Sequence, residues 1–404
     1  MGPGRSGWLT RRSLRAIGLM AAGLALVAAA SFQYWNPGRP GASPGTPTPS
    51  TASPAQSLLL DMAWTSPETG WLAVGAPSTM TLLRTTDGGR HWRRQLAGGF
   101  FMQMQFLDAR QGYVLRASPR PQLLETADGG QSWNARLLPD HVSSSARVHF
   151  LDAADGWLTS YLPPYTNAGT GSGIVLYRTR DGARSWRQVL SAAAGASHGL
   201  GAEDLKGPIS FADPLRGAMG SVAGPGGPGA YVTGDGGAVW RPVALPPPPG
   251  GWPPGESLTE PVLEMGAGGE GLLIVSNISA METVGWAYRT LDEGRSWRLT
   301  GPLPAAAGPT YDPAGHEATL STMTAQIAWY GFGTRTWVST DAGASWAGGT
   351  SLPGGWWIAQ LAPLSASTAW CGAVRATSNA LELGLFRTMN GGSEWARIPA
   401  PMGG

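Results

Sequence analysis

Six aspartates and one asparagine recur at the same position of a short repeated motif, and repeated carboxylates of this kind are candidate catalytic groups. Each lies two residues after a Thr or Ser and five residues before a Trp, in the pattern [ST]-x-[DN]-x-[GA]-x-x-W. The seven pairs are Asp87 and Trp92, Asp128 and Trp133, Asp181 and Trp186, Asp235 and Trp240, Asp292 and Trp297, Asp341 and Trp346, and Asn390 and Trp395. Carboxylates act as acids, bases and nucleophiles in glycosidases, and they also hold turns by accepting hydrogen bonds from backbone N–H groups.

The spacing of the motif favours the turn. In the first copy, Asp87 is followed by two glycines, which adopt the positive φ that a tight turn requires. Apolar residues precede the turn, and Trp92 follows it at the start of the return strand. Each copy therefore predicts a β-hairpin that is covered by a buried indole, with a structural Asp. Two copies depart from the pattern, with Ala183 in place of Gly and Asn390 in place of Asp.

Other residues that could do chemistry show no catalytic pattern. A sialidase-like glycosidase would need three arginines converging on a carboxylate, a Tyr–Glu pair and a separate acid. The arginines outside the motifs are scattered, and only nine tyrosines are present. The five histidines have no paired spacing, and Cys371 lies in an apolar segment typical of an inert core residue. We therefore expect no enzyme activity, no cofactor and no metal, with a sialidase-like glycoside hydrolase or glycan-binding protein as the alternative.

Arginines recur at two further positions, just before the motif Thr and just after the motif Trp. They are Arg84, Arg178, Arg289 and Arg387 at the first position, and Arg93, Arg187, Arg241 and Arg298 at the second. A ring of such cations could bind anions. We favour the structural interpretation, in which they are exposed strand residues whose stems cover a neighbouring indole.

A second, looser repeat precedes each hairpin and supplies two more strands. It is clearest in Phe106–Tyr113, Phe150–Trp157 and Phe211–Ala218, and it decays in the last three copies. Each copy reads as strand, Asp/Gly turn, strand. Seven repeats of four antiparallel strands predict an all-β fold, a seven-bladed β-propeller over residues 57–401. The first strand would be innermost and the last outermost, so the ring would close without an exchange of strands between the first and last blades.

Composition and charge agree with this fold. The chain has 60 Gly, 34 Pro and 19 Trp, and only 13% of its residues are charged, which suits strands joined by tight turns. The charged residues of the first forty positions are five arginines, Arg5, Arg11, Arg12, Arg15 and Arg39. The remaining chain therefore carries a small negative net charge, which removes the electrostatic basis for nucleic-acid binding.

The N-terminal region predicts export. Arg11, Arg12 and Arg15 precede fifteen uncharged residues that end at Ala30, which is the layout of a signal peptide. Residues 16–35 are also long enough for a membrane anchor. Residues 1–35 are thus a signal peptide cleaved near Ala30 or a membrane anchor, and residues 36–56 form a Pro/Gly/Ser/Thr linker. Either outcome predicts an extracytoplasmic protein, secreted or anchored in the membrane.

The motif resembles the Asp-box, or bacterial neuraminidase repeat. Together with the F-x-D-x-x-x-G-W element, the chain most resembles the photosystem II stability/assembly factor family. That resemblance implies an exported, non-enzymatic seven-bladed propeller that acts as a protein-binding scaffold. The expected partner is a protein or cell-envelope component, and we expect a monomeric propeller. Loops carry function on rigid scaffolds, and Trp252 in the Pro-rich segment 245–260 is the candidate partner contact.

Overall fold

The computed structural model divides the chain into two units, Met1–Pro54 and Ala55–Gly404. It describes residues 58–75, 80–117, 120–140, 142–143, 146–161, 173–192, 200, 206–224, 227–252, 258, 261–278, 282–307, 319–377 and 381–401. The predicted signal or anchor segment and the linker therefore lie outside the described residues. In the described part, no helix is long and apolar enough to cross a membrane.

Strands account for the regular structure that the model describes. In chain order they are β1 (Leu58–Trp64), β2 (Gly70–Gly75), β3 (Thr81–Thr85), β4 (Arg93–Ala97), β5 (Phe101–Phe106), β6 (Gly112–Arg116), β7 (Gln122–Thr126), β8 (Asn134–Arg136), β9 (Arg147–Phe150), β10 (Gly156–Tyr161), β11 (Ile174–Thr179), β12 (Arg187–Ala192), β13 (Lys206–Phe211), β14 (Gly217–Gly224), β15 (Gly227–Thr233), β16 (Arg241–Ala244), β17 (Val262–Met265), β18 (Gly271–Ile278), β19 (Glu282–Thr290), β20 (Arg298–Pro302), β21 (Ala306–Ala307), β22 (Thr319–Thr322), β23 (Ala328–Phe332), β24 (Arg335–Ser339), β25 (Ala347–Ser351), β26 (Trp357–Pro363), β27 (Ala369–Ala376), β28 (Leu381–Thr388) and β29 (Ala396–Ile398).

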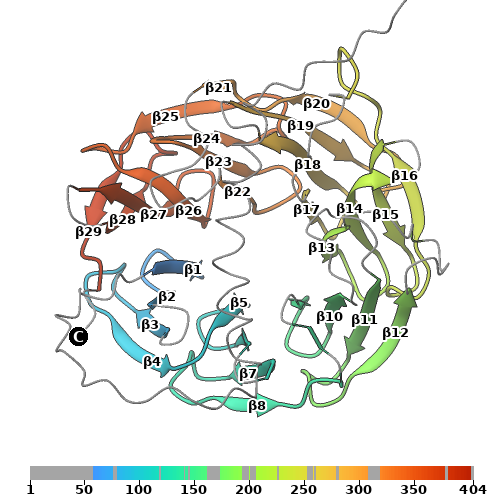
Figure 1. The fold of residues 1–404 in the computed structure, drawn as a ribbon, viewed down its shortest axis with the longest axis horizontal. Helices are drawn as coiled ribbons and strands as arrows, with labels where there is room; N and C mark the ends of the chain where they lie inside the picture. Colours follow the sequence, from blue (N-terminus) through green and yellow to red (C-terminus); the bar gives the residue numbers. More distant parts are fainter. Residues whose placement is uncertain are drawn as a thin grey trace, which may run out of the picture. The chain divides into compact units, whose positions relative to one another are not determined.

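These strands form seven antiparallel sheets, which we number as blades 1 to 7 from β1–β4 to β26–β29. Each blade takes four consecutive strands, and blade 5 adds the two-residue β21, which pairs with β19. The blades lie around a ring, with β1, β5, β13, β17, β22 and β26 on the inside and β4, β8, β12, β16 and β25 on the outside (Figure 1). The predicted seven-bladed propeller is confirmed.

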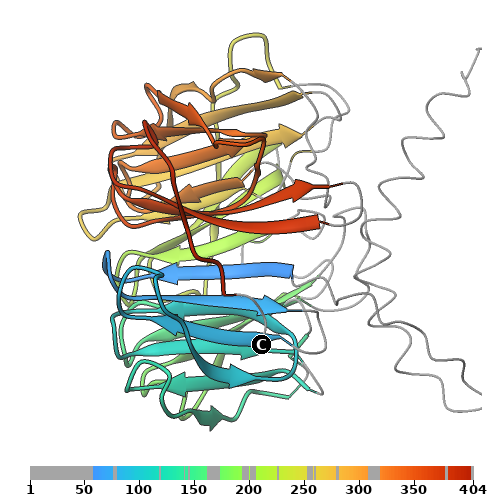
Figure 2. The ribbon, with the colours of Figure 1, turned by 90° about the vertical axis from the view of Figure 1, so that its left-hand side faces the viewer.

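The ring closes where blade 7 meets blade 1. Among the described strands, β1 pairs only with β2 and β29 only with β28, so the first and last blades exchange none of them. The blue strands of blade 1 and the red strands of blade 7 lie side by side in both views (Figures 1 and 2). The described strands confirm the predicted mode of closure, and side chains such as Asp61 with Gln360 and Trp64 with Trp370 make the contacts seen at the seam.

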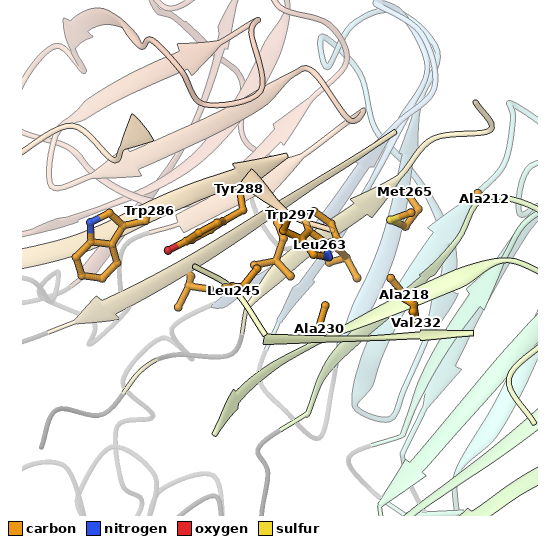
Figure 3. Packing of buried hydrophobic residues seen from close by; sticks show 12 residues of the cluster. Ala212, Ala218, Ala230, Val232, Leu245, Leu263, Met265, Trp286, Tyr288 and Trp297 are labelled. Carbon is orange, nitrogen blue, oxygen red and sulfur yellow. The ribbon is translucent and has the colours of Figure 1, made fainter. Parts of the chain in front are cut away.

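The hydrophobic core is divided among the blade junctions. Seven clusters of buried residues occur, and each contains residues of two neighbouring blades. Figure 3 shows the cluster between blades 4 and 5, where Ala218, Ala230 and Val232 of blade 4 lie near Leu263 and Met265 of blade 5. A single four-stranded sheet has too little core by itself, so stacking of neighbours supplies the burial that stabilises each blade.

Candidate functional site

The motif aspartates hold their own turns. In blade 2, Asp128 Oδ1 accepts a hydrogen bond from the Ser132 N–H at 2.9 Å, and Oδ2 accepts one from Ser132 Oγ at 2.6 Å. Thr126 Oγ1 donates to Asp128 Oδ1 at 2.9 Å and accepts the N–H of Gly130 at 2.7 Å. Both carboxylate oxygens are therefore occupied within the turn.

The hydrogen bond from the hydroxyl recurs in every blade. The Thr or Ser hydroxyl donates to the acid or amide at 2.8–3.0 Å in all seven turns. Hydrogen bonds from the residue four positions after the acid, His91, Ser132 or Ser185, together with this hydroxyl, lower the pKa of Asp87 and Asp128 well below the usual range, and that of Asp181 to about 2. A general acid needs a pKa near the working pH, so these carboxylates are poorly suited to proton transfer.

The turn conformation also explains the two positions after the acid. Both adopt a left-handed backbone, as at Gly129 with φ 77° and Gly130 with φ 97°. Ala183 (φ 64°), Glu293 (φ 63°) and Ala342 (φ 60°) keep this conformation without being glycine. The predicted Ala183 departure therefore leaves the turn intact at the cost of a strained residue, roughly 1–2 kcal/mol.

The motif tryptophans cover the turns to different extents. Trp240, Trp297 and Trp395 are buried, whereas Trp92, Trp133, Trp186 and Trp346 are half-buried. The indole N–H donates to a carbonyl of its own turn where Trp133 meets Gly130 O at 3.0 Å. Trp92 and Trp240 make the same hydrogen bond to their own turns, and complete burial of the motif Trp holds for three of the seven.

The second repeat builds a three-ring stack at four blade junctions. Phe106 of blade 2 stacks on Trp71 of blade 1 with ring centroids 3.6 Å apart, and Trp133 meets the edge of Phe106 at 6.4 Å. A Cβ on Gly112 would lie 2.3 Å from the Phe106 ring, so the glycine before the aromatic residue makes room for the stack. The equivalent ring pairs are Trp64 on Trp370, Phe150 on Tyr113 and Phe211 on Trp157. These rings explain the F-x-D-x-x-x-G-W pattern.

The arginines before the motif Thr differ from the exposed strand residues that we expect. Arg178 is 4% exposed, and its guanidinium carbon lies 5.1 Å from the Trp157 ring, across the β10–β11 pair. Arg84 covers Trp71 and donates to Ala109 O of the next blade at 3.0 Å. The indole that each arginine covers therefore lies on the second strand of the same blade and is not the motif Trp. At the other position, Arg93, Arg187, Arg241 and Arg298 are exposed as expected.

These arginines lie at separate junctions of the ring. Arg84 reaches from blade 1 toward blade 2, and Arg178 lies against the turn of blade 4 through Gly236. Arg387 covers Trp370 and lies against Gly88 of blade 1. They therefore do not converge on one anion, which a sialidase-like site would require.

Side chains of the inner strands connect one blade to the next, which the sequence does not reveal. Gln105 of β5 is the clearest example, because its amide donates to Phe150 O and accepts the N–H of Phe150, both at 2.8 Å. His149 Nε2 accepts the N–H of Phe211 at 3.2 Å, and Ser210 Oγ accepts the N–H of Met265 at 3.0 Å. We call these contacts the inner clamps.

Asp61 of β1 extends the inner clamps across the seam. Its carboxylate accepts the N–H of Met104 in β5 and the side-chain N–H of Gln360 in β26, both at 3.0 Å. Burial raises the pKa of Asp61 to about 6, and burial lowers that of His149 to about 4. The acid thus joins the inner strands of blades 1, 2 and 7.

The candidate partner contact, Trp252, lies against the ring. Its indole meets Trp286 edge-on at 5.7 Å and lies 6.2 Å from Tyr288, whose hydroxyl donates to Pro246 O at 3.0 Å. Trp252 is half-buried. The contacts tie the Pro-rich segment to blade 5, near the Trp286 end of the cluster in Figure 3.

The described residues contain no group of three or more His, Cys, Asp or Glu that could hold a metal ion. Cys371 is buried and unpaired, and burial raises the pKa of its thiol. The carboxyl and imidazole groups whose pKa burial shifts, Asp61, His149 and Glu264, lie on the inner strands, and sequence reasoning missed them. A usable signal was the polar residue just before the aromatic position, as in Gln105, His149, Ser210 and Glu264.

Fold and ring define the class of this protein, a seven-bladed β-propeller with a hydrogen-bonded turn motif in each blade. Within that class, the chain is similar to two YCF48 structures. One is YCF48 bound to a D1 peptide, with 18% identity, 83% of this chain and 95% of that chain covered, and a TM-score of 0.50. The other is YCF48 from Cyanidioschyzon merolae, with 15% identity, 83% and 96% coverage, and a TM-score of 0.50.

An uncharacterized protein from Listeria monocytogenes is also similar, with 9% identity, 85% and 94% coverage, and a TM-score of 0.51. No protein-family model matches the chain, and no curated protein sequence does. At these identities the comparisons establish the fold, and the activity of each relative remains its own.

Proposed function

We propose that this chain is an exported, non-enzymatic propeller that binds a protein partner, as a scaffold or assembly factor similar to the photosystem II assembly factors. The observation that carries the proposal is the engagement of the seven motif side chains in their own turns. The repeated acids are the residues most suggestive of glycosidase chemistry, and their geometry gives them a structural duty.

Two further points support a binding role. The arginines of the repeat lie at separate blade junctions and have contacts within the ring. A structure of similar architecture, YCF48, has been solved with a peptide bound, which makes a polypeptide a reasonable occupant for a rigid ring of this kind. Export rests on the basic and apolar N-terminal segment, residues 1–35.

A paired binding experiment tests this function. The full chain, purified in mild detergent, is applied to an array of synthetic peptides that cover the exposed segments of the host's membrane and exported proteins. A glycan array and a panel of glycosidase and polysaccharide lyase substrates are run in parallel. We expect saturable binding to a defined set of peptides that the heat-unfolded chain does not reproduce. Cleavage of any glycan, or glycan binding with no peptide binding, would overturn the proposal.

A further inference from the structure

At the junction between blades 5 and 6, Glu264 occupies the inner-clamp position, but it makes no hydrogen bond to blade 6 among the described residues. Glu264 of β17 pairs in register with Leu272, one step before the end pair Met265 and Gly271. Gln105 has the same place in β5, one step before Phe106 and Gly112. Within the described part of the chain, the Glu264 carboxylate has no hydrogen-bond partner, and burial raises its pKa to about 7.

The residue that Glu264 should hold is identified by register. Gln105 holds Phe150, which pairs with Gly156 and is followed by a turn in which the Leu151 N–H donates to Asp155 O. In blade 6 the same place belongs to Thr322. It pairs with Ala328, and the next residue donates its N–H to Ile327 O at 3.0 Å.

Neutral and ionised carboxyl groups differ in what they can offer Thr322. The Gln105 clamp needs one donor and one acceptor, because it meets both the C=O and the N–H of Phe150. A protonated carboxyl group has the same shape as an amide and offers the same pair. Glu264 is half-buried, and an ionised carboxylate there has acceptors only and loses part of its hydration without a cation to compensate it.

Among the described residues, no charged group compensates Glu264 at this junction. The neighbouring strands β14, β18 and β22 contain no charged residue, and the one in β13, Lys206, is at the opposite end of that strand from Ser210. Arg289 lies in the same cross-strand row, beyond Leu272, and has no hydrogen bond or ion pair among the described residues. Burial is accordingly the sole cause of the pKa shift at Glu264.

The rest of the junction is also less tightly built. Leu272 occupies the place that Trp71 has in blade 1, and Thr322 replaces the aromatic residue that stacks on it. All four residues of β22 are half-buried, whereas β5 has buried Phe101 and Met104. A lost clamp at this junction is therefore not compensated by a ring stack.

We propose that Glu264 is a proton-dependent clamp between blades 5 and 6: its protonated carboxyl group holds Thr322 of β22 as Gln105 holds Phe150 of β9, and its ionised form releases the strand. The proton moves between the carboxyl group and solvent, and no other bond forms or breaks. The junction between blades 5 and 6 then loosens as the pH rises through neutrality.

Hydrogen exchange of the full chain tests the clamp. Protection of the β22 amides, corrected for the intrinsic pH dependence of exchange, is measured between pH 5 and pH 8 and compared with that of the β10 amides, which lie away from both Glu264 and Asp61. We expect protection of β22 to fall by about tenfold or more as Glu264 ionises, with little change in β10. Protection of β22 that is flat across this range would overturn the proposal without any variant.

A reciprocal exchange of side chains provides the matched control. Glu264→Gln should keep β22 protected at every pH, because the amide supplies donor and acceptor permanently. Gln105→Glu should transfer the pH dependence to the β9 amides, because Gln105 holds β9 at the junction between blades 2 and 3 in the way proposed for Glu264. If β22 of Glu264→Gln still loses protection as the pH rises, or β9 of Gln105→Glu stays unchanged, Glu264 is not the clamp.

Discussion

Gly112 gives the sharpest test of how the ring is held together. A methyl group at this position would lie 2.3 Å from Cδ1 and 2.5 Å from Cε1 of Phe106, so the ring must leave its place on Trp71. Overpacking of this kind costs about 1–3 kcal/mol, and the lost ring stack adds about 0.5–1.5 kcal/mol. Replacing glycine gains about 0.4–1 kcal/mol by restricting the unfolded chain. We therefore expect Gly112→Ala to lower the free energy of unfolding by about 2–3 kcal/mol.

Urea unfolding, followed by tryptophan fluorescence and circular dichroism, measures this loss. Gly234→Ala is the matched control, because Gly234 has no atom within 4 Å of the added Cβ and is exposed. It should be neutral or slightly stabilising. The double variant with Phe106→Ala makes the test specific, because removal of the ring leaves room for the methyl group and Gly112→Ala should then cost nothing. Additive losses in the two variants would refute the idea that Gly112 exists to make room for Phe106.

Four further outcomes are expected. Asp128→Asn should flatten the acid side of the stability profile: the folded-state pKa of Asp128 is depressed, so its contribution is present above the ordinary pKa near 4 and is lost as the pH falls below it, as urea titrations from pH 2 to pH 7 would show. Arg178→Met should lower the free energy of unfolding by about 2–4 kcal/mol because it leaves Asp155 unpaired beside a buried junction, with Arg178→Lys intermediate in the same assay. Trp252→Ala should lower it by roughly 2 kcal/mol and increase protease cleavage of the Pro-rich segment, whereas a purely partner-binding Trp252 would leave both unchanged. Cys371 should react with a thiol reagent only as the chain unfolds, so labelling at the rate of an exposed thiol would contradict its burial.

The extent to which sequence predicts this structure follows from what each residue contacts. The turn motif is local: Asp128, Ser132 and Trp133 contact one another within a few residues, so their spacing alone indicates the hairpin. The stack of Phe106 on Trp71 joins two blades, and it could be inferred only as burial of aromatic faces. The prediction that this arginine position is exposed is wrong for the same reason, because Arg178 is buried against Gly236 of the next blade, which its own strand pattern does not show.

Inner clamps were the least predictable feature, since Gln105, His149, Ser210 and Glu264 share a place in the repeat but not a residue type. What they share is the backbone group that each should meet on the next blade, and that group is defined only by the closed ring. Because an amide, an imidazole, a hydroxyl and a carboxyl group all occur at this position, the common requirement is a polar atom in the right place. The chemistry at each junction can then vary while the architecture stays constant. Because the residue type at this position varies, a titratable group can occur at a single junction without a change of fold. Glu264, between blades 5 and 6, is such a group, and it has no charged or hydrogen-bonded partner among the described residues.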